Sequence, residues 1–360
     1  MRKLLCIVPA TYEELQAKGV DFGIQMRDLN GYWDEVITVH PFCKSTRRIT
    51  LSDRHTVIEF RKWDLTIIPL LVELIKRRGI TAIKAHDPFI CGLLGRALSR
   101  LCGIPYVATV YACYDLVDPI LRLRFLDRIA NRISMKGASL GFIGSEPACR
   151  LAISMGAKED KIRRARSANV WTGHFEEPRE RERDNTVFFA GRLSPEKGVT
   201  DMVNAFSVVA ASIPEAKLLI YGEGDMDISA QIAELGLTDK VTLLGFQSQE
   251  QVRETLLSVG VTLIPLGGNA LVEACLAQTP IVAYDLDWHP ELVEHGKGAL
   301  LAPFRDWRTM GEMAIRLLCD RELATRLGKE ARAQAILQRH PNALYRIEAQ
   351  AFNEVIGKER

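Results

Sequence analysis

The chain has 360 residues, of which 47% are hydrophobic and 26% are charged, a balance typical of soluble globular proteins. A single core does not usually extend over this length, so we expect two domains. No run approaches the roughly 18 consecutive apolar residues of a transmembrane helix, and the apolar stretch near residue 1 is too short for a signal peptide. These features lead us to expect a cytoplasmic protein.

The net charge of +2 is unevenly distributed. Residues 1–185 carry 30 Lys or Arg against 22 Asp or Glu, whereas residues 186–360 carry 17 against 23. A basic half can face phosphates, anionic lipid or an acidic substrate. Residues 121–136 alternate apolar and basic side chains at helical spacing, which suits peripheral contact with the inner face of a membrane. An ordinary sheet-covering helix with a solvated face is the interpretation we favour. Nucleic acid is not expected, because the basic stretches lack interleaved aromatic residues.

In the first half, short apolar runs alternate with longer amphipathic stretches. Strands are predicted at residues 4–9, 36–40, 82–85, 106–110 and 141–144, and helices at 65–78 and 90–102. A basic cluster spans Lys44 to Lys62. Residues 171–185 are polar, highly charged and without apolar periodicity, so we interpret them as an interdomain linker.

The alternation resumes at Thr186. Strands are predicted at 187–190, 217–221, 241–244, 261–265 and 280–284, and helices at 199–212, 227–235, 249–258, 269–277, 307–319, 321–339 and 343–356. This alternation is typical of parallel sheets with crossover helices. We therefore predict an α/β protein with two doubly wound, Rossmann-like domains, 1–170 and 186–340, that face each other across a cleft. Pro341 permits a change of direction, and the last helix, within 341–360, is expected to pack back on the first domain.

The segment from Phe189 to Val199 is a candidate anion-binding loop. A strand ends at Gly191, which permits close backbone approach, and a helix begins near Gly198. Arg192 offers a planar fork of donors and Lys197 a point charge, and both emerge close to a helix N-terminus. This combination suits a diphosphate. A surface loop whose charges pair with neighbouring acids is about equally compatible with the spacing.

A second candidate site follows the strand predicted at 261–265. Two glycines, Gly267 and Gly268, turn the chain, and a helix is expected to start near Asn269 as its N-cap. The free amides at 268–271 then form an anion site. Glu273 is placed to accept hydrogen bonds from sugar hydroxyls, although a carboxylate favoured by the helix dipole is the alternative.

Together these segments resemble retaining glycosyltransferases of the GT-B fold, in glycosyltransferase family 4, also called glycosyl transferases group 1. The resemblance is strongest over 186–340. Its motifs lie at 190–198, 221–225, 244–246, 269–274, 279–282 and 287–291.

The resemblance implies a transferase that moves a sugar from a nucleotide-diphosphate donor, UDP- or GDP-linked, to a glycan, lipid-linked or small-molecule acceptor. It implies retention of the anomeric configuration and no metal or other cofactor. Arg192 and Lys197 would neutralise the departing diphosphate, and Glu273 would bind the ribose hydroxyls. The phosphates would contact backbone at Gly191 and at Gly268, Asn269, Ala270 and Leu271, and the nucleobase would be bordered by Gly222, Glu223, Leu244 and Phe246.

The sequence departs from the family pattern at the second candidate site and in the first half of the chain. Pro265 and a short glycine turn stand where a second carboxylate normally contacts the donor sugar. In the first half, Gly19 is a candidate for the glycine loop on the acceptor side, and Tyr111 replaces a His. His86, at a predicted strand end, remains a candidate catalytic residue, and Asp115 a weaker acceptor-side candidate.

These departures keep two alternatives open. One is a nucleotide-sugar-binding module that has lost transfer, and the other is a sugar-nucleotide epimerase or hydrolase of the same fold. A dinucleotide oxidoreductase is disfavoured, because no G-x-G-x-x-G follows the first predicted strand.

Overall fold

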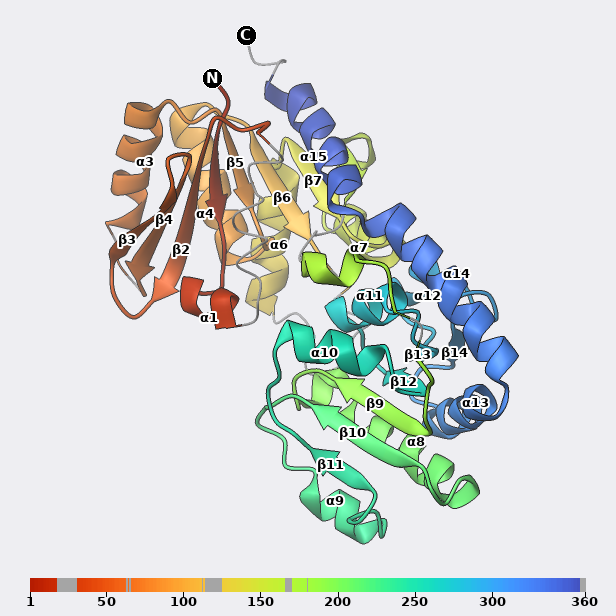
Figure 1. The fold of residues 1–360 in the computed structure, drawn as a ribbon. Coiled ribbons are helices and arrows are strands. Elements are labelled where there is room, and N and C mark those ends of the chain that lie inside the picture. The colour runs from red at the N-terminus through yellow and green to blue at the C-terminus, as the bar shows by residue number, and fades with distance from the viewer. Residues whose placement is uncertain are drawn as a thin grey trace. The chain divides into compact units, whose positions relative to one another are not determined.

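The computed structural model describes residues 1–17, 31–62, 64, 66–111, 113, 125–165, 170–179 and 181–356. They form two compact units (Figure 1). The first unit contains the described residues up to 165 together with 341–356, and the second contains those within 170–340. No helix in the described ranges is both long and apolar enough to cross a membrane.

The first unit is built on a sheet with eight strands in its described residues, in the order β3-β4-β2-β1-β5-β6-β7-β8. Neighbouring strands run parallel except β3 and β4, which pair antiparallel. The strands are β1 (Lys3–Ile7), β2 (Glu35–Cys43), β3 (Arg47–Ser52), β4 (His55–Arg61), β5 (Ala82–Ala85), β6 (Tyr106–Val110), β7 (Leu140–Ile143) and β8 (Ile162–Arg164).

Helices cover both faces of this sheet. Leu5 and Ile7 enter one buried cluster while Leu4 and Cys6 enter another, because successive side chains of a strand point to opposite faces. The first cluster packs under α3 (Ile67–Arg78), α4 (Ile90–Cys102), α6 (Phe125–Gly137) and α7 (Glu146–Ser154). The short helices α1 (Tyr12–Ala17) and η2 (Glu159–Lys161) complete the described elements before residue 165.

The last helix, α15 (Pro341–Ile356), packs on the second face. Phe352 is buried there, with its ring centroid 4.8 Å from that of Trp33 and 5.7 Å from that of Phe142. Lys84 Nζ of β5 forms an ion pair with Glu348 Oε2 at 2.6 Å. The C-terminal helix therefore contributes to the core of the first unit.

The second unit contains a fully parallel six-stranded sheet in the order β11-β10-β9-β12-β13-β14. The strands are β9 (Thr186–Ala190), β10 (Lys217–Tyr221), β11 (Val241–Leu243), β12 (Val261–Ile264), β13 (Ile281–Tyr284) and β14 (Leu300–Ala302). The helices are α8 (Val199–Ser212), α9 (Ser229–Glu234), α10 (Gln249–Leu256), α11 (Asn269–Leu276), α12 (His289–Leu292), α13 (Trp307–Cys319) and α14 (Arg321–Arg339), with the 3-10 turns η3 (Thr172–Phe175) and η4 (Pro195–Lys197).

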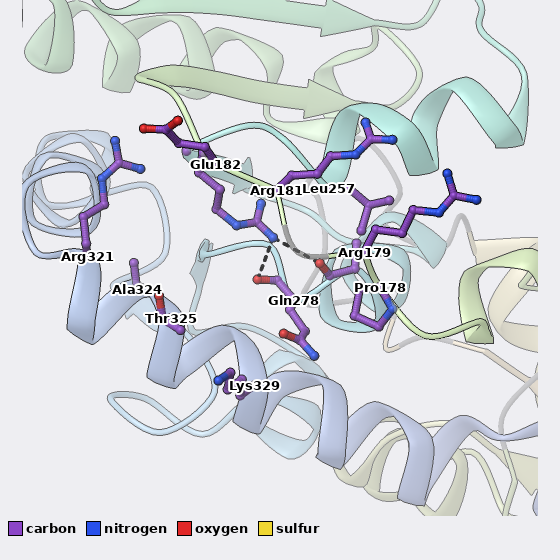
Figure 2. Close-up of a pocket in the computed structure, with 13 residues that line it drawn as sticks. Pro178, Arg179, Arg181, Glu182, Leu257, Gln278, Arg321, Ala324, Thr325 and Lys329 are labelled. Atoms are coloured by element: carbon purple, nitrogen blue, oxygen red, sulfur yellow. Dashed lines mark hydrogen bonds between the residues drawn. The ribbon is translucent and has the colours of Figure 1, made fainter.

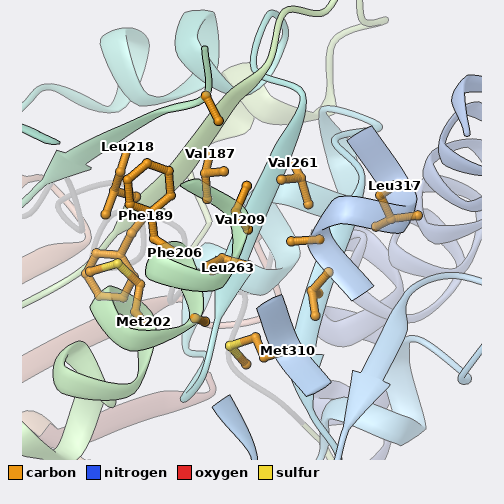
Figure 3. Packing of buried hydrophobic residues seen from close by; sticks show 14 of the residues in the cluster. Val187, Phe189, Met202, Phe206, Val209, Leu218, Val261, Leu263, Met310 and Leu317 are labelled. Carbon is orange, nitrogen blue, oxygen red and sulfur yellow. The ribbon is translucent and has the colours of Figure 1, made fainter. Parts of the chain in front are cut away.

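Two cores again flank the sheet. Val187 and Phe189 of β9 point into a cluster under α8 and α13, where Met202, Phe206 and Met310 are buried (Figure 3). Phe188 points the other way, into a cluster with residues of α10, α11, α12 and α14. The prediction of two doubly wound, Rossmann-like sheets is confirmed.

Residues 170–185 are attached to the second unit by specific contacts. Val170 is buried in the cluster around Phe188, and Phe175 packs against that cluster. The Arg183 guanidinium donates to the carbonyl oxygens at the ends of α10 and α11: Leu256 O and Val259 O at 2.9 Å, and Ala277 O and Gln278 O at 3.1 Å.

The predicted elements agree with the observed ones to within three residues at each end. The prediction did not include β3 and β4, which contain much of the basic cluster. Arg47 of β3 forms ion pairs with Glu59 of β4 and with Glu13. Part of the positive charge of the first half is therefore balanced within the fold.

Candidate active site

The loop after β9 lies against the loop after β10. Gly191 N–H donates to Tyr221 O at 2.9 Å, and Leu193 N–H donates to Glu223 O at 3.0 Å. Gly222 has φ +142°, and a Cβ at that position would lie only 1.8 Å from Gly191 O. Only glycine fits such a contact, so Gly222 fixes the path of the loop that carries Arg192.

The same loop also meets the turn after β12. Gly198 has φ +65°, and a Cβ there would lie 2.6 Å from Pro265 Cβ. A Cβ at Gly268 would lie 3.7 Å from Lys197 Nζ. The Lys197 ammonium therefore lies over the turn from which α11 begins. Two segments 70 residues apart in the sequence converge at the carboxyl ends of the neighbouring strands β9 and β12.

The positive charges of Lys197 and Arg192 beside the start of α11 are only partly neutralised by neighbouring carboxylates. Burial lowers the pKa of Lys197, and the charge of Arg192 lowers it further, while Glu196 acts in the opposite direction. Arg192 is exposed, with Nη1 3.4 Å from Glu196 Oε1. No carboxylate of the described residues lies within ion-pair distance of Lys197. An anion bound here would gain from both cations.

Glu273 projects from α11 and is only 7% exposed. Burial raises the pKa of its carboxyl group to about 7. In the described part of the chain its side chain has no hydrogen-bond or ion-pair partner. A buried carboxylate without a partner is costly, so this group is available to accept hydrogen bonds from a ligand.

His289 holds the glycine turn. Its ring Nδ1 donates to Tyr284 O at 2.8 Å, which leaves Nε2 to accept from Gly267 N–H at 3.0 Å. The hydroxyl of Tyr284 donates to Asp201 Oδ2 of α8 at 2.8 Å. The network therefore connects the ends of β12 and β13 with the helix that follows the Arg192 loop. His289 is not among the site residues predicted from the sequence, although it lies in the motif at 287–291.

The loops after β10 and β11 form the remaining predicted border. Gly222 N–H donates to Gly245 O at 2.8 Å, and Phe246 N–H donates to Glu223 Oε1 at 3.4 Å. Leu244 and Phe246 are 46% and 56% exposed. Together they form an apolar surface suited to a planar base.

One detail of the helix start differs from the prediction. Asn269 is the first residue of α11, and Gly268 occupies the N-cap without a side-chain hydrogen bond. Asn269 is therefore not the N-cap, because the glycine turn continues to Gly268 before the helix begins. Ala270 and Leu271 lie in its first turn, and the described residues contain no cluster of three potential metal-ligating side chains.

Two candidates of the first unit contact each other. His86 follows β5 and Tyr111 follows the neighbouring strand β6, and the Tyr111 hydroxyl hydrogen-bonds His86 Nδ1 at 2.5 Å. The carboxyl ends of adjacent parallel strands bring them together. A contact between His86 and Tyr111 was not predicted from the sequence. Gly19 and Asp115 lie outside the described residues.

Comparisons with known proteins agree with this arrangement. Residues 172–334 match the family of glycosyl transferases group 1. The chain is 27% identical over 327 residues to the 2-deoxystreptamine glucosyltransferase of Streptomyces kanamyceticus, covering 83% of this chain and 84% of that protein. It is 22% identical over 317 residues to the N-acetyl-alpha-D-glucosaminyl L-malate synthase of Bacillus anthracis, covering 78% and 76% of the two chains. The crystal structure of Anabaena HepE in complex with UDP-glucose has a TM-score of 0.77 at 18% identity, over 98% of this chain and 100% of that one.

Proposed function

We propose that this nucleotide-sugar glycosyltransferase of the GT-B fold, which matches glycosyl transferases group 1 over residues 172–334, transfers a hexose, with retention, from a nucleotide-diphosphate sugar to a small polar acceptor. The convergence of Lys197 with the start of α11 carries the proposal. This convergence brings the Lys197 ammonium, the N-terminus of α11 and the Glu273 carboxylate together within the second unit.

Each part of this arrangement suits one part of the donor. Arg192 and Lys197 offer charge to the two phosphates, and the amides at Gly268 and Asn269 add donors at the positive end of a helix. Glu273 accepts two hydrogen bonds from vicinal ribose hydroxyls. Leu244 and Phe246 cover the base.

The transfer breaks the bond between the anomeric carbon and the β-phosphate oxygen, and the electron pair leaves with the nucleoside diphosphate. An acceptor hydroxyl oxygen bonds to the anomeric carbon, and its proton passes to the departing phosphate. The cations stabilise the charge that develops on the phosphate oxygens. Lys197 contributes strongly because its site is partly desolvated.

Two relatives support the acceptor class that we propose. The two described above match more than three quarters of this chain, and their names contain 2-deoxystreptamine and L-malate. Both are small polar molecules, which supports a small acceptor over a polymer. Because HepE was crystallised with UDP-glucose, UDP-glucose is the first donor to test.

The test combines binding with turnover. Thermal shift with UDP-, GDP-, ADP- and TDP-sugars should show stabilisation by one nucleotide class, and that donor should be consumed only when a small polar acceptor is added. Arg192→Ala and Lys197→Ala should each lower kcat/KM by about 100-fold, whereas Lys240→Ala, on the same unit, should not. Consumption of the donor without an acceptor would indicate a hydrolase. Donor binding without turnover would indicate a module that has lost transfer. Wild-type kinetics in both variants would refute the site.

We also propose peripheral contact with an anionic membrane through α6. Phe125 and Leu126 are 77% and 74% exposed, and Ile129 and Ile133 follow on the same face at 41% and 45%. Basic residues alternate with them along the helix, which suits an anionic bilayer. Phe125→Ser should reduce sedimentation with phosphatidylglycerol vesicles severalfold while leaving soluble donor binding intact. Equal sedimentation of both proteins would refute this contact.

A further inference from the structure

A cavity of about 580 Å³ lies in the second unit, away from the candidate donor site (Figure 2). It is bordered by residues 178–179 and 181–183, by the ends of α10 and α11, and by the first turns of α14. Its volume lies within the range of about 300–1,000 Å³ that is common for small-molecule sites. The charged residues of its wall are Arg179, Arg181, Glu182, Arg183, Arg321 and Lys329.

Close backbone packing builds one side of the cavity. A Cβ at Gly328 would lie 2.2 Å from Gln278 O, so only glycine permits this approach of α14 to the end of α11. Gln278 itself adopts φ +56°, which is uncommon for a residue other than glycine. Arg321, Thr325 and Lys329 follow at intervals of four along α14 and therefore share the face that borders the cavity.

The described wall of the cavity is strongly basic, since five of its residues are cationic and one is acidic. Two of the cations, Arg321 and Lys329, come from residues 186–360, which carry six more acidic than basic side chains. Arg181 forms an ion pair with Glu254. Among the described residues, Arg179, Arg321 and Lys329 have no ion-pair partner.

Arg183 adds a charge that is not paired with a carboxylate of the described residues. Its four hydrogen bonds go to neutral carbonyl oxygens. The pKa of its guanidinium is lowered to about 10, first by burial and then by the positive charge of Arg321. Carbonyl dipoles solvate the charge but do not cancel it, so the field of Arg183 and Arg321 in the cavity favours an anion.

We propose that this cavity is a second anion site, which binds a small soluble ligand through a phosphate group. Arginine forks and a lysine ammonium match the geometry and charge of phosphate oxygens. Arg321 and Lys329 provide the direct donors, and Arg183, with its amino hydrogens already engaged, provides charge. The eight-residue helix α11 separates this site from the start of the donor site by about 12 Å, so one pyrophosphate cannot contact both.

Calorimetric titration with inorganic pyrophosphate tests the proposal through stoichiometry. Pyrophosphate should bind the wild-type protein at two sites. Arg192→Gln combined with Lys197→Gln should remove the donor-site component and leave one site. Arg321→Gln combined with Lys329→Gln should leave only the donor-site component, because each substitution weakens the second site by about tenfold. Combining all four substitutions should abolish binding.

A matched control variant should change the affinity of the second site in the opposite direction. Glu182→Gln removes the one acidic side chain among the described residues of the wall and should tighten the second site by about two- to fivefold. Sodium chloride at equal ionic strength should not produce the second component. Circular dichroism and donor turnover of the Arg321→Gln, Lys329→Gln protein should match the wild type, since neither residue lies at the donor site. One site in the wild-type protein, or two sites of unchanged affinity in that variant, would overturn the proposal.

Discussion

Glu273→Gln is expected to stabilise the free protein while weakening its activity. The carboxyl group is buried, and burial raises its pKa from 4.5 to about 7. The folded state therefore binds a proton more tightly than the unfolded state, and wild-type stability falls as pH rises from about 4.5 to 7. A shift of about 2.5 units corresponds to roughly 3 kcal/mol of lost unfolding free energy above pH 7, and to about 1 kcal/mol at pH 5.

The glutamine variant has no carboxylate to ionise, so it should not show this loss. Equilibrium urea unfolding at pH 5 and pH 8 measures the difference between variant and wild type at each pH. Glu234→Gln, an exposed position on α9, is the matched control and should show no comparable pH-dependent gain. If Glu273→Gln has the same pH dependence of unfolding as the wild type, the carboxylate is not the desolvated group inferred here.

Donor binding should show the opposite dependence on pH. Ribose hydroxyls donate to the ionised carboxylate, and with a pKa of about 7 only about a tenth of the free protein is ionised at pH 6. The donor should therefore bind about tenfold more weakly at pH 6 than at pH 8, and binding should release a proton. Glu273→Gln should bind weakly at both values. A wild-type donor affinity that does not vary with pH would separate Glu273 from the ribose.

Two further predictions concern contacts that the sequence did not reveal. His289→Phe removes the acceptor of Gly267 N–H. The loss lowers the free energy of unfolding by about 1–3 kcal/mol if the amide stays buried, and it should raise the donor KM by about tenfold in steady-state kinetics. An unchanged KM would show that the turn is stable without this hydrogen bond. Tyr111→Phe removes the hydrogen bond to His86 and should lower kcat severalfold in single-turnover experiments, with donor affinity unchanged because the pair lies in the first unit. A parallel loss of donor affinity would indicate a merely structural contact.

The fold was predictable because its signals are local. Buried parallel strands appear as short apolar runs, and α8, α13 and α14 begin and end where the periodicity does. The hairpin of β3 and β4 was not predicted, since its apolar side chains are interrupted by charged and hydroxyl-bearing ones and form no continuous apolar run. Its stability comes from pairing with β2 and from the ion pair between Arg47 and Glu59.

The candidate donor site was predictable only in part. Arg192, Lys197 and Glu273 stand in motifs with fixed spacing, so the sequence indicated them. The polar composition of residues 171–185, by contrast, gave no sign that Arg183 binds four carbonyl oxygens. His289 was equally hidden, because its role depends on a hydrogen bond to a turn 22 residues away. Contacts of this kind follow from tertiary packing, which no local pattern encodes.

The departures from the family pattern in the second unit form one connected structure. Pro265 stands where a carboxylate was expected, and its ring contacts the position of Gly198, where no side chain fits. The shortened turn that follows is held by His289, which in turn is fixed by the backbone of Tyr284. We infer that the turn replaces the missing carboxylate as a unit, presenting backbone amides to the donor sugar. Restoring a glutamate at Pro265 alone should therefore not recover the family's mode of sugar recognition, because the turn and His289 would remain as they are.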